Sequence, residues 1–353
     1  MGMNSTLWVK GELTDTLDSG VVDSRHLLKE RATSTLFERP DWFAATLPVL
    51  ADGARPLVGH SWGEHAHCWL FLSAQDGRRA TALASWYSFA FGPIFRGTTD
   101  KSQKQALLLA LARRLRQAKS GPVEIAMAPV PRRDGTSKFV RTAFRKAGWW
   151  VLRHQSSTSW TVDVAGQSFA EYWAARPGQL RNTHDRKLRK FGVKTEILTR
   201  FDAESWSEYE SVYAESWKPK EGDAAFLRAM AEREGEAGCL RLGLARLEGR
   251  VVAAQFWTVE NGIAYIHKLA HREAAKESSA GTILSAALFR HVINTDQVGR
   301  VDFGTGNDRY KADWMDHSAP LDTLRLYNPR HPLGLLRYAK ARISALVHGS
   351  RVD

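Results

Sequence analysis

Small residues crowd the start of a strongly patterned helix in the stretch KESSAGTILSAALFRHV, residues 276–292. At a helix N-terminus four backbone N–H groups lack a partner within the helix, and the helix dipole adds partial positive charge there. Small side chains let an anion such as a phosphate reach these groups. An ordinary loop with a helix cap has the same composition, so the neighbouring elements are needed to distinguish an anion site from such a loop. The residues that would form an anion site, through charge, hydroxyl groups, close backbone approach or capping, are Lys276, Ser278, Ser279, Ala280, Gly281 and Thr282.

A second group of reactive side chains follows a short apolar run in RVDFGTGNDRYK, residues 300–311. Acyl transfer from a thioester needs an acceptor held against the carbonyl, a base for its proton and stabilisation of the oxyanion. Asp302 or Asp308 could accept that proton, and Tyr310 could donate one to the departing thiolate. Lys311 could hold a phosphate or the oxyanion. The plain alternative is a strand end followed by a glycine turn.

A histidine precedes both stretches, in the apolar run IAYIHKLA of residues 263–270. The ordinary pKa of a histidine lies near neutrality, so His267 is a further candidate base. A histidine that is merely packed in a strand, or exposed on it, explains the same pattern.

The elements that must position these residues occur twice in the same order. Residues 67–89 contain two β-rich runs joined at Asp76-Gly77, and a leucine-rich helix is predicted over residues 101–121, with a short strand after it. In the second half, residues 239–270 contain three strand-like runs with turns at Glu248-Gly249 and Asn261-Gly262, which is typical of an antiparallel meander. A helix and a short strand again follow.

This faint duplication predicts an α+β fold with two tandem domains of one type, each a twisted, mostly antiparallel sheet flanked by helices. The expected parts are a flexible leader over residues 1–34, an N-terminal domain over 35–164, a C-terminal domain over 165–330 and a basic helix over 331–353. For the last of these, a helix docked on the second domain is one interpretation, and a helix lying on a membrane surface is the other.

The composition fits a soluble globular chain, with 43% hydrophobic and 25% charged residues among 353. The formal net charge of +12 favours anionic partners, which include phosphates, nucleic acid and an acidic membrane face. Cys68 and Cys239 are far apart in no metal-ligand spacing, so we expect neither a disulfide nor a metal site. Without a recognisable signal peptide or a membrane-spanning run, we expect a cytoplasmic protein that is at most peripheral at the inner face of the membrane.

The densest basic run is RPGQLRNTHDRKLRKFGVK, residues 176–194. It is either a solvated helix face or a clamp for a phosphorylated donor or acceptor. Aromatic residues do not interleave with the basic ones as they do in an RNA-recognition module, so we expect no stable nucleic-acid complex.

The meander, the small-residue stretch and the following VDFGTGNDRYKADWM together resemble the BioF2-like (CelD/BcsL-type) acetyltransferases of the GNAT superfamily. This branch is similar in turn to the FemAB peptidoglycan-bridge transferases, which have two tandem GNAT-like domains and use aminoacyl-tRNA. The resemblance covers residues 35–328 and is specific in residues 265–315. The superfamily phosphate loop has Gln or Arg, then Gly, then Gly or Ala; this chain has Lys276, Ser279 and Gly281, so the first glycine is missing.

The resemblance implies an N-acyltransferase that moves an acyl group directly from acetyl-CoA or another acyl-CoA to an amine, which could be linked to a sugar. It places polysaccharide or cell-envelope biosynthesis as the setting. It further implies that a backbone N–H within Lys268, Leu269 and Ala270 meets the oxyanion, and that the loop at 276–282 holds the pyrophosphate.

Three alternatives belong to different classes. The first is a FemAB-like aminoacyl-tRNA-dependent transferase, which the basic run favours. The second is a non-catalytic GNAT-like binding protein, which Ser279 in place of glycine favours. The third is general nucleic-acid binding driven by charge, which predicts an affinity that falls steeply with salt and ignores coenzyme A.

Overall fold

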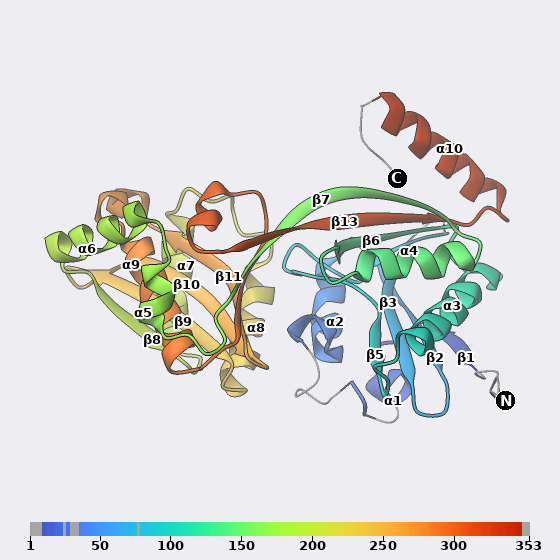
Figure 1. Cartoon of the computed structure of the whole chain (residues 1–353), viewed down its shortest axis with the longest axis horizontal. Helices are drawn as coiled ribbons and strands as arrows, with labels where there is room; N and C mark the ends of the chain where they lie inside the picture. The colour runs from blue at the N-terminus through green and yellow to red at the C-terminus, as the bar shows by residue number, and fades with distance from the viewer. Residues whose placement is uncertain (1–8, 24–25, 29–34, 76–77, 348–353) are drawn as a thin grey trace. The chain divides into compact units, whose positions relative to one another are not determined.

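A computed structural model describes residues 9–23, 26–28, 35–75 and 78–347 of the chain (Figure 1). The chain divides into two compact units: unit 1 contains residues 1–158 and 319–353, and unit 2 contains residues 159–318. Each unit has a mostly antiparallel sheet with helices packed on it, so the predicted α+β class is confirmed.

The sheet of unit 1 has the strand order β1-β2-β3-β4-β6-β13, and β5 also pairs with β3. All of these pairings are antiparallel except that of β4 with β6, which is parallel. The predicted hairpin of β3 and β4 is confirmed, while its turn residues 76–77 lie outside the described residues. The elements are β1 (Lys10–Thr14), α1 (Ser19–Val22), α2 (Pro40–Thr46), β2 (Arg55–Trp62), β3 (His67–Gln75), β4 (Arg79–Ala82), β5 (Ile94–Arg96), α3 (Lys101–Gln117), β6 (Glu124–Pro131), α4 (Thr136–Lys146), the first part of β7 (Trp150–Asp163), most of β13 (His317–Tyr327), α10 (Pro332–Val347) and the 3-10 turns η2 (Leu36–Glu38) and η3 (Leu47–Val49).

The sheet of unit 2 has the order β7-β12-β11-β10-β9-β8, in which only β11 and β12 are parallel. The predicted meander is β9, β10 and β11. Both of its turns have positive φ at both central residues, at Glu248-Gly249 and at Asn261-Gly262, as two-residue hairpin turns require. The elements are α5 (Phe169–Ala174), α6 (Gly178–Phe191), β8 (Lys194–Leu198), α7 (Ala203–Ala214), α8 (Ala224–Glu236), β9 (Leu240–Leu247), β10 (Arg250–Glu260), β11 (Ile263–His271), η5 (Glu273–Ser278), α9 (Ala280–Asn294), β12 (Arg300–Thr305) and η6 (Arg309–Asp313).

Helices α9 and α7 cover opposite faces of the unit 2 sheet. Successive side chains of a strand point to opposite faces. On β10, Gln255 and Trp257 contact α9 through Ser285 and Phe289, whereas Phe256 packs edge-on against Trp206 of α7. The apolar pattern of α9 is explained by this core, which buries Ile283, Leu284, Leu288 and Val292. The sheet is therefore fixed between two helices, and its central strands are buried on both sides.

The strands β7 and β13 change the expected division of the chain. The sequence places one boundary near residues 164–166, but β7 pairs with β12 only from Ser159 onward, and β13 pairs with β6 of unit 1 from Leu321 onward. The end of β7 therefore pairs in the sheet of unit 2, and most of β13 pairs in the sheet of unit 1. For the same reason α10 belongs to unit 1, not to the second domain on which the sequence suggested that it would dock.

The expected leader is also partly structured. Residues 10–14 form β1, which pairs with β2 from Lys10↔Trp62 to Thr14↔Val58. The polar composition of this segment conceals the strand, because β1 is an edge strand with one side exposed. Among the helices of the described residues, no helix has the length and apolar content needed to cross a bilayer.

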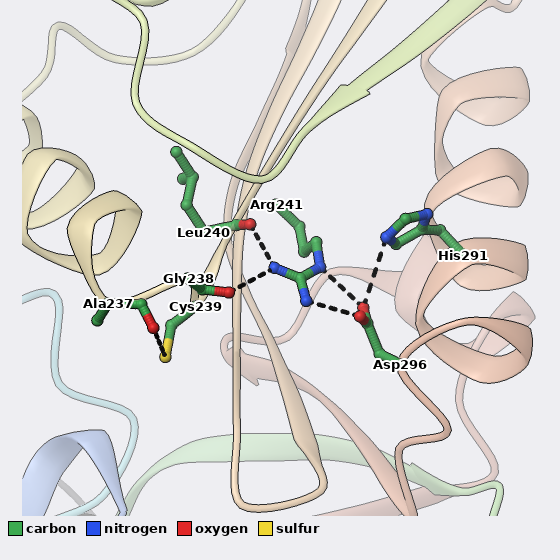
Figure 2. Close-up of polar contacts among 7 residues, drawn as sticks. All are labelled: Ala237, Gly238, Cys239, Leu240, Arg241, His291 and Asp296. Carbon is green, nitrogen blue, oxygen red and sulfur yellow. Dashed lines mark hydrogen bonds and ion pairs between the residues drawn. The ribbon is translucent and has the colours of Figure 1, made fainter.

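A buried ion pair fastens the C-terminal end of α9 to the start of β9 (Figure 2). Asp296 follows the helix and accepts hydrogen bonds from Arg241 Nε at 2.9 Å and Nη2 at 2.6 Å. Arg241 Nη1 donates to the carbonyls of Gly238 at 2.9 Å and Leu240 at 2.6 Å, so the guanidinium is bonded on all its sides. His291 Nε2 lies 3.8 Å from the same carboxylate.

We expect Arg241→Ala to lower the free energy of unfolding by about 3–5 kcal/mol, because it leaves Asp296 buried and uncompensated. The measurement is the denaturant midpoint of the full chain. The matched control is Arg228→Ala, which removes an exposed ion pair with Glu232 and should cost under about 1 kcal/mol. Equal losses in the two variants would contradict the role of the buried pair.

Candidate active site

The strands β11 and β12 part after only three paired positions. Their parallel register runs from Ile263↔Arg300 to Tyr265↔Asp302 and then stops, although both strands continue. Beyond Tyr265 and Asp302 the facing edges of the two strands no longer pair with one another. The predicted loop after β12 and the end of β11 thus lie on two sides of an opening in the sheet.

A bulge in β11 lies at this fork. Phe256 of β10 pairs with Lys268, whereas the next residue, Trp257, pairs with Ile266, so His267 is the extra residue. A bulge re-aims the side chains around it. Here His267 Nε2 lies in hydrogen-bond contact with Thr258 Oγ1 at 2.8 Å, and its ring is tilted against that of Phe256, on the sheet face that α7 covers. Sequence patterns do not reveal this bulge.

The predicted residues of β11 have different surroundings. Burial, and then the charge of Lys268, lowers the pKa of His267 to about 3, so the ring stays neutral near pH 7 and is a weak proton acceptor. Lys268 Nζ contacts Glu221 at 2.9 Å and lies over the ring of Tyr213 of α7. Leu269 packs toward α9, and Ala270 is buried.

Asp302 and Lys311 form the polar centre of the loop after β12. The Asp302 carboxylate accepts a hydrogen bond from the N–H of Gly304 at 2.8 Å. Burial raises the pKa of Asp302 to about 6, although this bond and the charge of Lys311 act in the opposite direction. Lys311 Nζ is buried and donates to the carbonyls of Phe303 at 3.0 Å and Thr305 at 2.7 Å. Burial lowers the pKa of Lys311 to about 8, although Asp308 opposes that shift.

The same loop brings Asp308 close to Lys311. Gly306 has a φ of 130°, which side chains disfavour, and a Cβ there would lie 3.2 Å from Asp308 Oδ2 and 3.4 Å from Lys311 Nζ. Trp160 of β7 fixes this glycine by donating from Nε1 to its carbonyl at 2.8 Å. Tyr310 is 37% exposed and lies edge-on to Phe303; partial burial of the hydroxyl, with Asp308 adding to it, raises the pKa of the phenol, which therefore stays protonated.

The small-residue stretch begins α9, but not in the way its hydroxyl groups suggested. Ser279 is the N-cap, in the left-handed region at φ 53°, and its side chain makes no capping bond. Ser278 is buried; its hydroxyl donates to the carbonyl of Ala275 and accepts from the N–H of Ala280. Thr282 lies inside the first turn, so the expectation that it caps the helix is wrong. The N–H groups of Gly281 and Thr282 are in the turn where no helix carbonyl accepts from them.

Gln255 is a buried residue that the sequence did not single out. Its Nε2 donates to the carbonyl of Gly281 at 3.1 Å and to Ser285 Oγ at 2.8 Å, and its Oε1 accepts from Trp257 Nε1 at 3.0 Å. Each polar atom of this amide is therefore bonded, which makes the contact rigid as well as specific. Gln255 holds the first turn of α9 against β10.

The basic run forms α6, and part of it lies beside this helix start. Lys187 Nζ donates to the carbonyl of Glu277 at 2.6 Å, and Lys190 Nζ contacts the carboxylate of Glu277 at 3.0 Å. Lys276 is exposed and lies 3.9 Å from Glu273. Arg176, at the start of the run, is buried in an ion pair with Asp316 and supports the fold instead.

The end of β11 adds a second unexpected residue. The ring of His271 lies tilted against that of Trp217 with ring centroids 4.4 Å apart, and a Cβ on Gly281 would lie 3.6 Å from His271 Nδ1. Its Nε2 is buried without a hydrogen-bond partner among the described residues. The spacing also shows that packing leaves room for a small side chain at Gly281, so the fold itself does not require glycine there.

A pocket of about 400 Å³ lies between α7, α8 and the segment that joins them. Asp202 and Asp223 cap the two helices, and these caps are the sequence signal that could have located both. Burial, with Glu221 adding to it, raises the pKa of Tyr213 to about 12. Burial, with the charge of Lys268 adding to it, lowers the pKa of Lys218. The residues that line this pocket include Trp206, Tyr209, Tyr213, Lys218, Glu210 and Glu221.

The described residues contain no group of three or more His, Cys, Asp or Glu side chains in an arrangement that could hold a metal ion. The polar residues of the fork are instead a carboxyl group, an ammonium group, a phenol and backbone amides. Their pKa shifts leave a carboxyl that ionises near pH 6 and a lysine that loses its proton near pH 8.

Three solved structures share this fold. FemX matches with a TM-score of 0.59 at 12% identity, covering 92% of this chain and 99% of that one. L-PGS from Bacillus licheniformis matches with a TM-score of 0.53 at 12% identity, covering 90% and 96%. The C-terminal domain of a putative lysylphosphatidylglycerol synthetase from Agrobacterium fabrum matches with a TM-score of 0.51 at 14% identity, covering 78% and 85%. At 12–14% sequence identity, these matches show that the fold is shared.

In sequence, no curated protein matches the chain. A domain model does match: residues 178–312 fit the acetyltransferase (GNAT) domain. The match spans α6 to η6 and so includes the fork between β11 and β12, the start of α9 and the loop with Lys311. The resemblance to the GNAT superfamily is thereby confirmed for this region, while the BioF2-like branch stays a prediction. Within unit 2, residues 178–312 are thus similar to the acetyltransferase (GNAT) domain.

Proposed function

We propose that the protein is an N-acyltransferase that moves an acyl group from acyl-CoA directly to an amine. The observation that carries this proposal is the position of the α9 start and of the Asp302–Lys311 loop, which follow the two strands that part from one another. One edge of the sheet thus has backbone N–H groups for an anion and polar groups for the transfer.

The donor would bind along the fork with its pyrophosphate at the first turn of α9. The N–H groups of Gly281 and Thr282 and the helix dipole suit phosphate oxygens. Lys276 is exposed beside them, and Lys187 and Lys190 lie on the adjoining helix. Ser279, as N-cap, could add a hydroxyl, whereas the Ser278 hydroxyl is already hydrogen-bonded to the backbone of Ala275 and Ala280.

The chemical step would need no covalent enzyme intermediate. The amine nitrogen attacks the thioester carbonyl, the C–N bond forms and the C–S bond breaks. The amine proton goes to a general base. Asp302 is a stronger candidate for this base than His267, because the pKa of Asp302, about 6, lies nearer to neutrality. Lys311 and a backbone N–H within 268–270 would stabilise the oxyanion, and Tyr310 would return a proton to the thiolate. Asp308 would keep Lys311 charged.

The pocket between α7 and α8 suits the acceptor. Its walls combine the rings of Trp206, Tyr209 and Tyr213 with the carboxylates of Glu210 and Glu221. Aromatic faces and carboxylates both attract an ammonium group. The acceptor is therefore proposed to be an amine with a ring or short chain; an amino sugar of a polysaccharide or of the cell envelope follows only from the family resemblance.

A FemAB-like transfer from aminoacyl-tRNA is the second candidate. The exposed basic residues of α6 favour it, because a polyanion gains affinity from each phosphate contact. A non-catalytic GNAT-like protein is the third, and Ser279 in place of glycine favours it. The two experiments below separate these candidates.

We expect acetyl-CoA to bind the wild-type chain and Gly281→Asp to lose that binding by at least about tenfold, because the new carboxylate blocks and repels phosphate at the helix start. Isothermal titration with acetyl-CoA and desulfo-CoA measures this. The matched control is Gly178→Asp at the first residue of α6, where a side chain meets nothing within 4 Å. If the chain binds tRNA but not coenzyme A, the FemAB-like candidate is supported instead. If it binds neither, the non-catalytic GNAT-like protein is supported.

We expect kcat/KM for acetyl transfer to an amino sugar such as glucosamine to rise with pH through about 6 and to fall through about 8. Asp302 must be ionised to act as a base, so the rate gains as pH rises through its pKa. Lys311 must be charged to meet the oxyanion, so the rate declines as pH rises through its pKa. Thiol release from acetyl-CoA measures the rate.

The variants assign the two limbs of this profile. Asp302→Asn should remove the acidic limb and cost about 100-fold or more in rate. Lys311→Arg should move the alkaline limb upward, because the guanidinium stays charged. Asp163→Asn, an exposed carboxylate on β7, is the control and should leave the profile unchanged. A profile that Asp302→Asn leaves intact would exclude Asp302 as the base.

A further inference from the structure

Helix α10 packs on unit 1 through one narrow stripe of residues. Gly334 lies so close to Asn328 that a Cβ would meet the carbonyl oxygen of Asn328. Arg337 Nη1 lies 3.5 Å from Glu124 Oε2 at the start of β6, and the ring of Tyr338 lies 4.6 Å from that of Trp150. With the half-buried Ala341 and Ala345, these residues recur every three or four positions and define the docked face of α10.

The opposite face of α10 is apolar and exposed. Residues three, four and seven positions apart share one side of a helix, and here that side turns away from unit 1. Surface leucines that occur singly are ordinary, but six apolar residues on one side form a continuous stripe. The exposed fractions are 40% for Leu335, 66% for Leu336, 62% for Ile343, 76% for Leu346 and 74% for Val347, and the exposed Ala339 lies among them.

Basic side chains border this stripe on both sides. Helical spacing places Lys340 along one edge of it and Arg342 along the other, and both are exposed. Long basic side chains in this position can extend their charged ends toward anionic head groups while their stems cover apolar surface. The helix has 16 residues, or about 24 Å, which is too short to span a bilayer but sufficient to lie along one.

An apolar helix face can be covered by a second copy of the chain or by a lipid surface, and the charge around the face of α10 favours the lipid surface. A second copy of the chain would bring Lys340 and Arg342 of two protomers together, and each protomer has a formal net charge of +12. An anionic bilayer instead offers acyl chains to the stripe and opposite charge to its borders.

We propose that the exposed face of α10, formed by Leu335, Leu336, Ala339, Ile343, Leu346 and Val347 and bordered by Lys340 and Arg342, docks unit 1 on an anionic lipid surface. The docked face keeps the helix attached to the protein while the apolar face enters the interface. The site lies outside residues 178–312, the region that matches the GNAT domain.

The test is flotation of the full chain with vesicles of phosphatidylcholine alone and of phosphatidylcholine with 30% phosphatidylglycerol, where about 30% is an ordinary anionic content. We expect wild-type protein to float with the anionic vesicles and to dissociate as salt is raised. The double variant Leu336→Gln/Ile343→Gln should bind at least about tenfold more weakly. Lys340→Gln and Arg342→Gln should each weaken binding about fivefold.

The control is Leu188→Gln, an exposed leucine on the basic helix α6, which should bind vesicles like wild type. Each α10 variant should keep its thermal unfolding midpoint and its titration with acetyl-CoA, so that a failed lipid test is distinct from a failed donor test. The proposal is overturned if wild type does not float with anionic vesicles, or if it floats equally with neutral ones. It is also overturned if sedimentation velocity shows a dimer that the double α10 variant abolishes.

Discussion

The short parallel pairing of β11 with β12 is the constraint on which unit 2 depends. Two parallel strands need a crossover, and α9 supplies it. In such a crossover the helix starts at the same edge of the sheet where both strands end. The start of α9 and the loop after β12 therefore meet at one edge without any special contact between them. Because the pairing stops at Tyr265↔Asp302, the same edge also has backbone that the ladder does not use.

Two anchors keep this geometry in place from opposite ends of α9. Gln255 ties the first turn to β10, and the Arg241–Asp296 pair ties the region after the last turn to β9. The two anchors differ in charge. The Gln255 amide at the helix start is neutral and neither attracts nor repels a phosphate strongly, whereas the Arg241–Asp296 ion pair lies at the far end of the helix. The position of the helix start is thus independent of the charges that are proposed to act there.

Part of this site could be predicted from the sequence. The two hairpin turns, the apolar face of α9 and the polar loop at 300–311 are local patterns, and each was visible as such. The bulge at His267 was not, because a bulge depends on the register of the neighbouring strand. Helices α7 and α8 were missed although Asp202 and Asp223 cap them, since their apolar positions are interrupted by polar residues. The change of unit by β7 and β13 was invisible for a stronger reason: a strand has the same period-two pattern in either sheet.

The duplication of the fold does not extend to the helix start at which the anion is proposed to bind. In unit 1 the parallel pair is β4 and β6, and α3 lies in the crossover as α9 does in unit 2. Asp100 caps α3: its carboxylate accepts from the N–H of Gln103 at 2.7 Å and from Ser102 Oγ at 2.5 Å, and these bonds, the one to Ser102 first, lower its pKa. A phosphate approaching α3 would therefore meet a fixed negative charge on the groups it needs. At α9 the cap is Ser279, and no acidic residue lies in the first turn of the helix, so this start has no counterpart of the Asp100 carboxylate.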